Sequence, residues 1–161
     1  MRMAEFDALP APAARAALVD CCAAPEWAGR LVAERPHSSL AALLDRADAI
    51  LADLDDDQVD LALAGHPRIG ERPAHASSAR EQAGVAAAPD DVRAALVEGN
   101  RAYEQRFGHV YLVCADGRPA TELLDVLRSR LGNDPATERA VLRGELAKIN
   151  RIRLGRLLDN A

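Results

Sequence analysis

The sequence predicts an all-α fold, a compact bundle of about eight short helices, and three observations support this prediction. Alanine and leucine supply most of the apolar residues, and both are strong helix formers. Aromatic residues make up only 3% of the chain, which disfavours sheets. Proline or glycine repeatedly interrupts the helical segments, so short helices joined by short turns are expected. Because 49% of the 161 residues are hydrophobic, we expect residues 1–161 to form a single domain.

Eight helices are expected, and the clearest boundary lies before the last of them. Asp134 can cap free N–H groups there, and Pro135 suits the first helical position. Acidic residues at 53 and 55–57 could suggest a metal site, but a solvated, acidic helix start explains them better. The expected helices span residues 12–23, 25–34, 39–52, 56–64, 78–86, 90–106, 120–131 and 135–158.

Charge and cysteine usage exclude several classes of protein. A net charge of -5 disfavours a broad nucleic-acid or anionic-membrane surface, so neither partner is expected. The three cysteines fit neither a disulfide framework nor zinc-site spacing, so we expect reduced thiols in the core. No signal peptide and no stretch of about 18 uncharged apolar residues is evident, so a cytoplasmic location is expected.

The segment 65–77 is rich in glycine and proline and predicts an irregular active-site loop. His66 stands between Gly65 and Pro67, which presents the imidazole from a helix end rather than a helix face. Such a histidine suits a general acid or base, although a surface or capping histidine is the simpler alternative. His37, His75 and His109 show no helical ligand spacing with His66, so no metal site is expected.

A capping box follows this loop at Ser78 and Glu81, three residues apart. In this motif the serine caps a new helix and the glutamate reaches back to the backbone of the serine. The same geometry could place Ser78, Glu81 and Gln82 at a helix N-terminus facing the loop, where anionic groups are favoured. Capping and ligand binding are compatible, so both interpretations stand.

The last expected helix carries an arginine on its apolar side. Leu142, Leu146, Ile149 and Leu157 fall on one stripe, and Arg153 projects into its middle, so we expect Arg153 to be buried. A buried guanidinium needs a partner, which is either a structural carboxylate or a ligand. The pattern alone does not separate these two possibilities.

Taken together, the motifs resemble those of the 2-oxo-4-hydroxy-4-carboxy-5-ureidoimidazoline (OHCU) decarboxylase family. Each motif alone is weak, but they occur in the order of the family and cover about residues 62–158. The matching pieces are Gly-His-Pro-Arg-Ile-Gly at 65–70, Ser78-x-x-Glu81-Gln82-Ala-Gly84, Asn100-x-x-Tyr103-x-x-Arg106-Phe107-Gly108 before the apolar run VYLVC, Arg130-Leu-Gly-Asn133 with Glu138, and Glu145-x-x-Lys148-Ile149-x-x-Ile152-Arg153-Leu154.

This resemblance implies an all-helical, commonly homodimeric enzyme that forms (S)-allantoin and carbon dioxide from OHCU in urate breakdown, without a cofactor. It implies catalytic roles for two residues, His66 and Glu81. The implied substrate contacts are Pro67, Ser78, Gln82 and Arg153, together with backbone groups near Val113 and Ala115. One departure is Gly-His-Val-Tyr at 108–111, where many members have Gly-Phe-Pro-Phe, so no role is assigned to His109.

Two other functions remain as alternatives. A non-enzymatic helical module could bind an acidic partner or nucleic acid through its arginine-bearing C-terminal helix, which would require Arg153 on an exposed basic face. A hydroxyisourate hydrolase acts in the same pathway, but that enzyme is β-rich, so a helical fold would exclude it.

Overall fold

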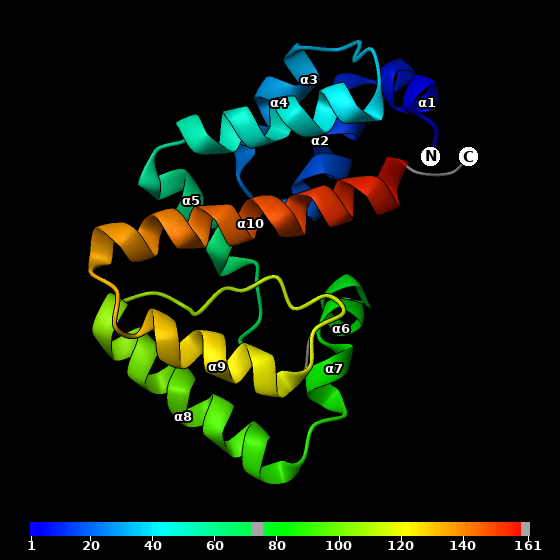
Figure 1. Cartoon of the computed structure of the whole chain (residues 1–161). Helices are drawn as coiled ribbons and strands as arrows, with labels where there is room; N and C mark the ends of the chain where they lie inside the picture. The colour runs from blue at the N-terminus through cyan, green and yellow to red at the C-terminus, as the bar shows by residue number, and fades with distance from the viewer. Residues whose placement is uncertain (72–75, 159–161) are drawn as a thin grey trace. The chain divides into compact units, whose positions relative to one another are not determined.

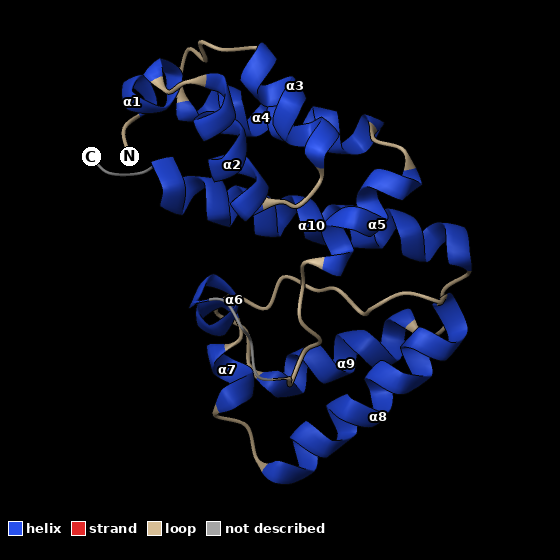
Figure 2. Ribbon diagram, turned by 180° about the vertical axis from the view of Figure 1, so that it is seen from behind, coloured by secondary structure: helices blue, strands red, loops and turns tan. Residues whose placement is uncertain are grey.

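The computed structural model describes residues 1–71 and 76–158, and every regular element in these ranges is an α-helix (Figure 1). The all-α prediction is confirmed, and the described residues contain no strand (Figure 2). Ten helices are present there: α1 (Met3–Ala8), α2 (Ala11–Cys21), α3 (Pro25–Ala33), α4 (Leu40–Asp53), α5 (Asp56–Ala64), α6 (Ala76–Glu81), α7 (Ala83–Ala86), α8 (Asp90–Phe107), α9 (Ala120–Arg130) and α10 (Pro135–Leu158).

The helices match the expected bounds within two residues in seven of eight cases, and the differences have local causes. The short helix α1 was not expected from the sequence. Its start is held by the Arg2 backbone N–H, which donates to Glu5 Oε2 at 2.9 Å. The helix expected over 78–86 is divided, because Gln82 leaves helical geometry between α6 and α7 with φ −98° and ψ 18°.

Two compact units make up the chain. The first comprises Met1–Gly65 and Ala147–Ala161, and the second comprises His66–Leu146. Helix α10 therefore contributes residues to both units. The expectation of a single domain remains a prediction.

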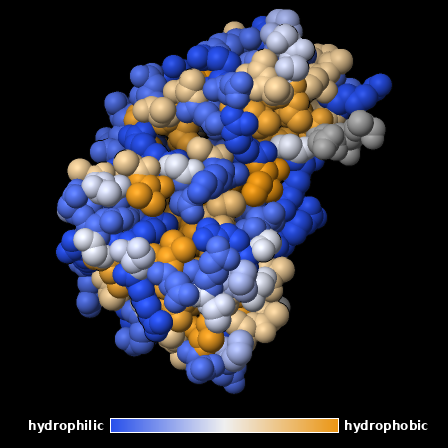
Figure 3. Space-filling model, viewed as in Figure 1, coloured by the Kyte–Doolittle hydropathy of each residue, from blue (hydrophilic) through white to orange (hydrophobic). Residues whose placement is uncertain are grey.

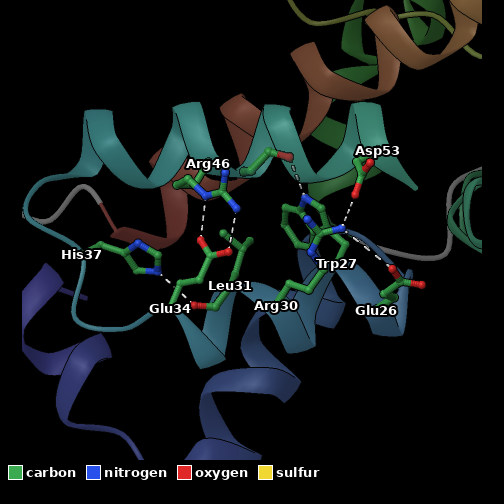
Figure 4. Close-up of polar contacts among 9 residues, drawn as sticks. Glu26, Trp27, Arg30, Leu31, Glu34, His37, Arg46 and Asp53 are labelled. Carbon is green, nitrogen blue, oxygen red and sulfur yellow. Dashed lines mark hydrogen bonds and ion pairs between the residues drawn. The ribbon is translucent and has the colours of Figure 1, made fainter. Parts of the chain in front are cut away.

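In the first unit, helix α3 packs against α2 and α4. Figure 4 shows polar contacts of α3 residues, among them the hydrogen bond of Trp27. Trp27 is fully buried, and its indole Nε1 donates to the carbonyl of Ala47 on α4 at 3.0 Å. Leu31, Leu43 and Ile50 are fully buried in the same unit. The buried tryptophan therefore combines apolar burial with a satisfied polar atom, as a stable core requires.

In the second unit, α8 and α9 lie side by side, and the segment 108–119 between them runs back along α9 (Figures 1 and 2). The helices approach closely because Gly99 on α8 has no Cβ, which would collide with the Leu127 side chain. Gly108 ends α8 in the left-handed conformation with φ 76°, which glycine adopts without strain. The reversed segment therefore starts directly at the end of α8.

The capping prediction at the start of α10 is confirmed. Asp134 Oδ1 accepts from the Thr137 backbone N–H at 2.9 Å, and Pro135 is the first helical residue. The acidic start of α5 is also exposed, as expected, with Asp56 and Asp57 in its first turn. The starts of α10 and α5 can both be predicted from the sequence because each depends on residues that are neighbours in the chain.

Polar and apolar residues are interspersed on the surface shown in Figure 3. Among the described residues, the large hydrophobic side chains classed as exposed are Leu61 and Val97. Within the same ranges, no helix combines the length and the hydropathy needed to cross a bilayer.

Candidate active site

His66 lies at the end of a helix, as the sequence predicts. Helix α5 ends at Ala64, and the chain turns through Gly65 before His66 and Pro67. Both His66 and Pro67 are half-buried. The imidazole is therefore carried by a turn, where its direction depends on how the following residues are anchored.

The residues after Pro67 are anchored by polar side chains from two other segments. Asn100 on α8 is buried and donates through Nδ2 to the carbonyl of Ile69 at 2.8 Å. The Gln82 side chain accepts from the backbone N–H of Gly70 at 3.1 Å and donates to the carbonyl of Arg68 at 3.5 Å. The turn that carries His66 is thus tied to α8 and to the break between α6 and α7.

Ser78, Glu81 and Gln82 form a buried polar group, but not through the predicted capping box. Helix α6 begins at Ala76, so Ser78 is its third residue, and the Ser78 carbonyl accepts from the Gln82 backbone N–H at 3.0 Å. Ser78 is therefore not the N-cap residue, and the predicted capping box is wrong. Glu81 and Gln82 stand at the end of α6 and not at its N-terminus, so the expectation that places them there is wrong as well. All three side chains are at most 8% exposed. A carboxylate is costly to bury, so this cluster is a candidate site on physical grounds.

The apolar run expected to supply backbone contacts has no regular secondary structure among the described residues, and Figures 1 and 2 draw it as an open stretch along α9. It is held in place from its side: Tyr111 is buried and its hydroxyl donates to the Leu123 carbonyl at 3.0 Å. Val113 and Ala115 are buried as well. The run therefore presents main-chain polar groups in a buried position, where such groups need partners.

The end of α6 and the apolar run lie near one another. Burial raises the pKa of the Cys114 thiol, and the negative charges of Glu145 and Glu81 raise it further. Gly84 packs against the end of the run, because a Cβ there would lie 2.5 Å from the Arg118 carbonyl oxygen. The second unit thus brings Glu81 into the surroundings of residues 113–115.

A buried ion pair supports the far end of the same run, and sequence reasoning assigned no role to its residues. Glu138 is fully buried and accepts from Arg130 Nε at 2.7 Å, from Tyr103 Oη at 2.5 Å and from Asn133 Nδ2 at 3.1 Å. Burial and the bond to Glu138 raise the pKa of Tyr103, which keeps its hydroxyl a donor. Burial works against the charge of Arg130, but the bond to Glu138 keeps the pKa of its guanidinium raised.

Arg153 belongs to the first unit, whereas the other predicted site residues belong to the second. It is half-buried rather than buried, and its Nη1 donates to the carbonyl of Cys21 at 3.2 Å. The expectation that Arg153 is buried is wrong, and Leu157 of the expected stripe is half-buried too, because the buried side chains at this end of α10 are Leu154 and Leu158. Leu142, Leu146 and Ile149 are buried as expected. The meeting of Arg153 with His66 and Glu81 remains a prediction.

The basic residues of α10 do not form a free cationic face. Arg151 pairs with Asp45 and Asp48 on α4 at 2.8 and 2.7 Å. The remaining basic residues of α10 also have interaction partners within the chain: Arg139, Arg143, Lys148, Arg153 and Arg156. A docking surface for an acidic partner therefore gains no support from this helix.

Histidines and cysteines elsewhere are used for packing. His37 Nε2 bonds to the carbonyl of Leu31 at 2.9 Å (Figure 4), and His109 stacks on Phe107 with ring centroids 6.1 Å apart. The three cysteines are buried thiols that form no disulfide among the described residues, whereas His75 lies outside those residues. In residues 1–71 and 76–158, no group of three or more histidine, cysteine or acidic side chains could hold a metal ion.

Two cavities adjoin the turn at 68–71, with volumes of about 270 and 290 Å³. Gln82 lines the first and Asn100 lines the second. His66 and Glu81 line neither cavity. The buried polar side chains, and not these cavities, therefore define the candidate site.

Comparison with known proteins identifies a family over most of the chain. A family model described as OHCU decarboxylase matches residues 7–155. The uric acid degradation bifunctional protein TTL of Arabidopsis thaliana is 26% identical over 148 residues, which are 87% of this chain and 46% of that protein. The 2-oxo-4-hydroxy-4-carboxy-5-ureidoimidazoline decarboxylase of Amia calva is 42% identical over 55 residues, which are 34% of this chain and 31% of that protein. The matched stretches thus cover less than half the length of each of these relatives.

Solved structures give the same fold. A crystal structure of OHCU decarboxylase in the presence of (S)-allantoin has a TM-score of 0.79 and 24% identity, and the match covers 88% of this chain and 96% of that one. A crystal structure of (S)-allantoin synthase has a TM-score of 0.78 and 18% identity, and the match covers 99% of this chain and 55% of that one.

Proposed function

Because this chain belongs to the OHCU decarboxylase family, we propose that it converts OHCU to (S)-allantoin and carbon dioxide in urate breakdown. The observation that carries the proposal is the buried group of Ser78, Glu81 and Gln82, whose Gln82 side chain is bonded to the turn after His66. Buried polar clusters of this kind are costly in a core and typical of a site.

The chemistry of the substrate explains why this reaction needs no cofactor. In OHCU, one ring carbon carries both the carboxylate and a hydroxyl group, and it lies next to a C=N bond. When carbon dioxide leaves, its bonding electrons flow into that bond and form an enamine-like intermediate. The substrate is its own electron sink, so the protein has only to orient it and move protons. A proton leaves the hydroxyl oxygen, and another reaches one face of the neighbouring carbon.

We assign the proton transfer to His66 and Glu81. The half-buried imidazole at the helix end removes or relays the hydroxyl proton. The buried Glu81 carboxylate orients the hydroxyl or the imidazole, and its charge destabilises the nearby substrate carboxylate. Decarboxylation removes that repulsion, which favours the forward reaction.

The remaining predicted residues bind and orient the substrate. Arg153 holds the ureido and ring carbonyl oxygens, for which a planar fork of donors is suited. Ser78 and Gln82 fix which face is protonated. Pro67 packs against the substrate beside His66. The backbone groups of Val113 and Ala115 complete the pocket. We further propose that the protein is a homodimer, the state that the family resemblance implies, and that it acts in the cytoplasm.

Generating OHCU in situ from urate, with urate oxidase and hydroxyisourate hydrolase, tests this proposal directly. Allantoin formation is followed by circular dichroism, because protonation from one face gives a signal and uncatalysed protonation from both faces gives none. We expect the wild-type protein to produce the (S)-allantoin signal. A signal no faster than that of the coupling enzymes alone would refute the proposed activity.

The role of His66 is tested by His66→Gln, with His37→Gln as the matched control. His37 bonds to a backbone carbonyl in the first unit and has no place in the proposed site. We expect His66→Gln to lower kcat by roughly 10²- to 10⁴-fold, the usual contribution of an acid–base group. His37→Gln should leave the rate unchanged. A folded His66→Gln protein with a near-normal rate would contradict the assignment.

A further inference from the structure

Two arginines hold carbonyl groups of the apolar run. Arg130 Nη1 donates to the carbonyl of Leu112 at 2.7 Å, and Arg118 Nη1 donates to the carbonyl of Cys114 at 3.3 Å. Both arginines are themselves fixed by carboxylates. Arg130 is bonded to the fully buried Glu138, and Arg118 Nε donates to Glu122 at 3.0 Å.

Fixing these carbonyls also fixes the next N–H groups, because each peptide unit is planar and trans. The carbonyl of Leu112 and the N–H of Val113 share one plane and point in opposite directions. The same relation joins the carbonyl of Cys114 to the N–H of Ala115. Each N–H group therefore points away from the arginine that holds the carbonyl before it.

These two N–H groups are in need of acceptors. Val113 is 2% exposed and Ala115 is 4% exposed, and among the described residues neither N–H group donates to a backbone carbonyl. A buried backbone donor without an acceptor costs free energy and is rare in folded proteins. A ligand that offers carbonyl or carboxylate oxygens would satisfy both donors.

We infer that Arg130 and Arg118 are positioning residues for the proposed reaction, because they aim the N–H groups of Val113 and Ala115 at oxygens of the substrate. This inference rests on the proposed function. It also explains why a guanidinium that is only 5% exposed is retained in the core of the second unit. A hydrophobic residue there would pack as well but would not hold the Leu112 carbonyl.

The main test is Arg130→Lys, measured by the circular dichroism assay with initial rates at varied substrate concentration. A lysine cannot bind Glu138 and the Leu112 carbonyl with the fork geometry of arginine. We expect KM to rise about tenfold, the loss of roughly one hydrogen bond, with kcat within about twofold of wild type. A purely structural role would reduce the folded fraction, which lowers the apparent kcat at unchanged KM.

Tyr103→Phe is the control matched for burial. It removes one hydrogen bond to Glu138 from the same buried network but leaves the bond between Arg130 and Leu112. We expect it to lower the free energy of unfolding while KM stays unchanged. An equal rise of KM in Tyr103→Phe and Arg130→Lys would overturn the inference, because loosening the network would then be sufficient.

Arg118→Met provides a second arm if Arg130→Lys does not fold. Arg118 is half-buried, and methionine preserves most of its apolar stem. We expect a smaller rise of KM, about three- to tenfold, because the bond to Cys114 is longer. Arg101→Met is the control, since it removes an exposed arginine that pairs with Glu98 on the surface of α8. An unchanged KM in Arg118→Met would overturn the inference for this residue.

The outcomes separate the inference from the function on which it rests. If the wild-type protein forms no (S)-allantoin, the proposed function fails and the inference fails with it. If the wild type is active but Arg130→Lys and Arg118→Met keep the wild-type KM, only the inference fails. Hydrogen exchange adds a direct readout: bound (S)-allantoin should slow exchange of the Val113 amide in the wild type and not in Arg130→Lys.

Discussion

The two units of this protein use the pairing of arginine with glutamate in opposite ways. In the first unit, Arg46 on α4 binds Glu34 through two bonds of 2.7 and 2.6 Å at the surface (Figure 4). In the second unit, Arg130 binds Glu138 in a site where the glutamate is fully buried. The pairs differ in geometry and in surroundings, because Arg46 binds both carboxylate oxygens of Glu34, whereas Arg130 Nε and Nη2 both face Oε1 of Glu138. Buried pairs are costly to form and costly to break, so they are retained where they do something that an apolar residue could not.

The largest effect is expected when the buried pair is broken. Glu138→Gln leaves the Arg130 charge buried without its carboxylate, which should lower the free energy of unfolding by about 3–5 kcal/mol. Urea denaturation followed by circular dichroism measures this change. A loss below about 1 kcal/mol would mean that the network tolerates an uncompensated charge, and the contrast between the two units would disappear.

A medium effect is expected from Gly84→Ala. Gly84 lies in the second unit, as the buried pair does, and the variant tests how closely α7 packs there against the backbone of Arg118. The Cβ of Gly84→Ala would lie 2.5 Å from the Arg118 carbonyl oxygen, so backbone must move. We expect a loss of about 1–3 kcal/mol in the same denaturation experiment. Gly144→Ala is the control, because nothing lies within 4 Å of its Cβ in α10. It should stabilise the protein by about 0.5–1 kcal/mol, so a loss in both variants would contradict the packing argument.

The smallest effect is expected at the surface pair, from Glu34→Gln. The hydrogen bond from Arg46 lowers the pKa of Glu34 below its ordinary value of 4.5. The pair therefore contributes stability above pH 4.5, and this contribution is lost as the pH falls through the lowered pKa. We expect Glu34→Gln to cost less than about 1 kcal/mol at pH 7 and nothing at a pH well below 4. A cost that stays constant with pH would show that another interaction of Glu34 is responsible.

Much of the fold could be predicted because the signals are local. Asp134 and Pro135 mark the start of α10, and the structure places the helix there. The same kind of reasoning failed at Ser78. The capping box is a local pattern too, but α6 begins two residues earlier, so tertiary packing of the buried serine outweighs the local signal. The break at Gln82 has the same origin, since its side chain is committed to the turn at 68–70.

The candidate site could be predicted in part for a similar reason. The placement of His66 follows from Gly65 and Pro67, which are neighbours in the sequence. The function of Asn100 and Arg130 depends on carbonyl groups 31 and 18 residues away. No periodicity or spacing in the sequence reports such a contact. The motifs that contain Asn100 and Arg130 can be found in the sequence, but the carbonyl groups that these side chains hold are seen only in the structure.

The distribution of aromatic residues gives each unit its own optical reporter. The chain has one tryptophan and two tyrosines. Trp27 is in the core of the first unit, whereas Tyr103 and Tyr111 stand together in the second, with ring centroids 5.3 Å apart. Fluorescence excited at wavelengths that only indole absorbs follows the first unit, and phenol absorbance follows the second. If the melting curves of the two chromophores coincide, the two units unfold in one cooperative transition. If the curves separate, the units unfold independently.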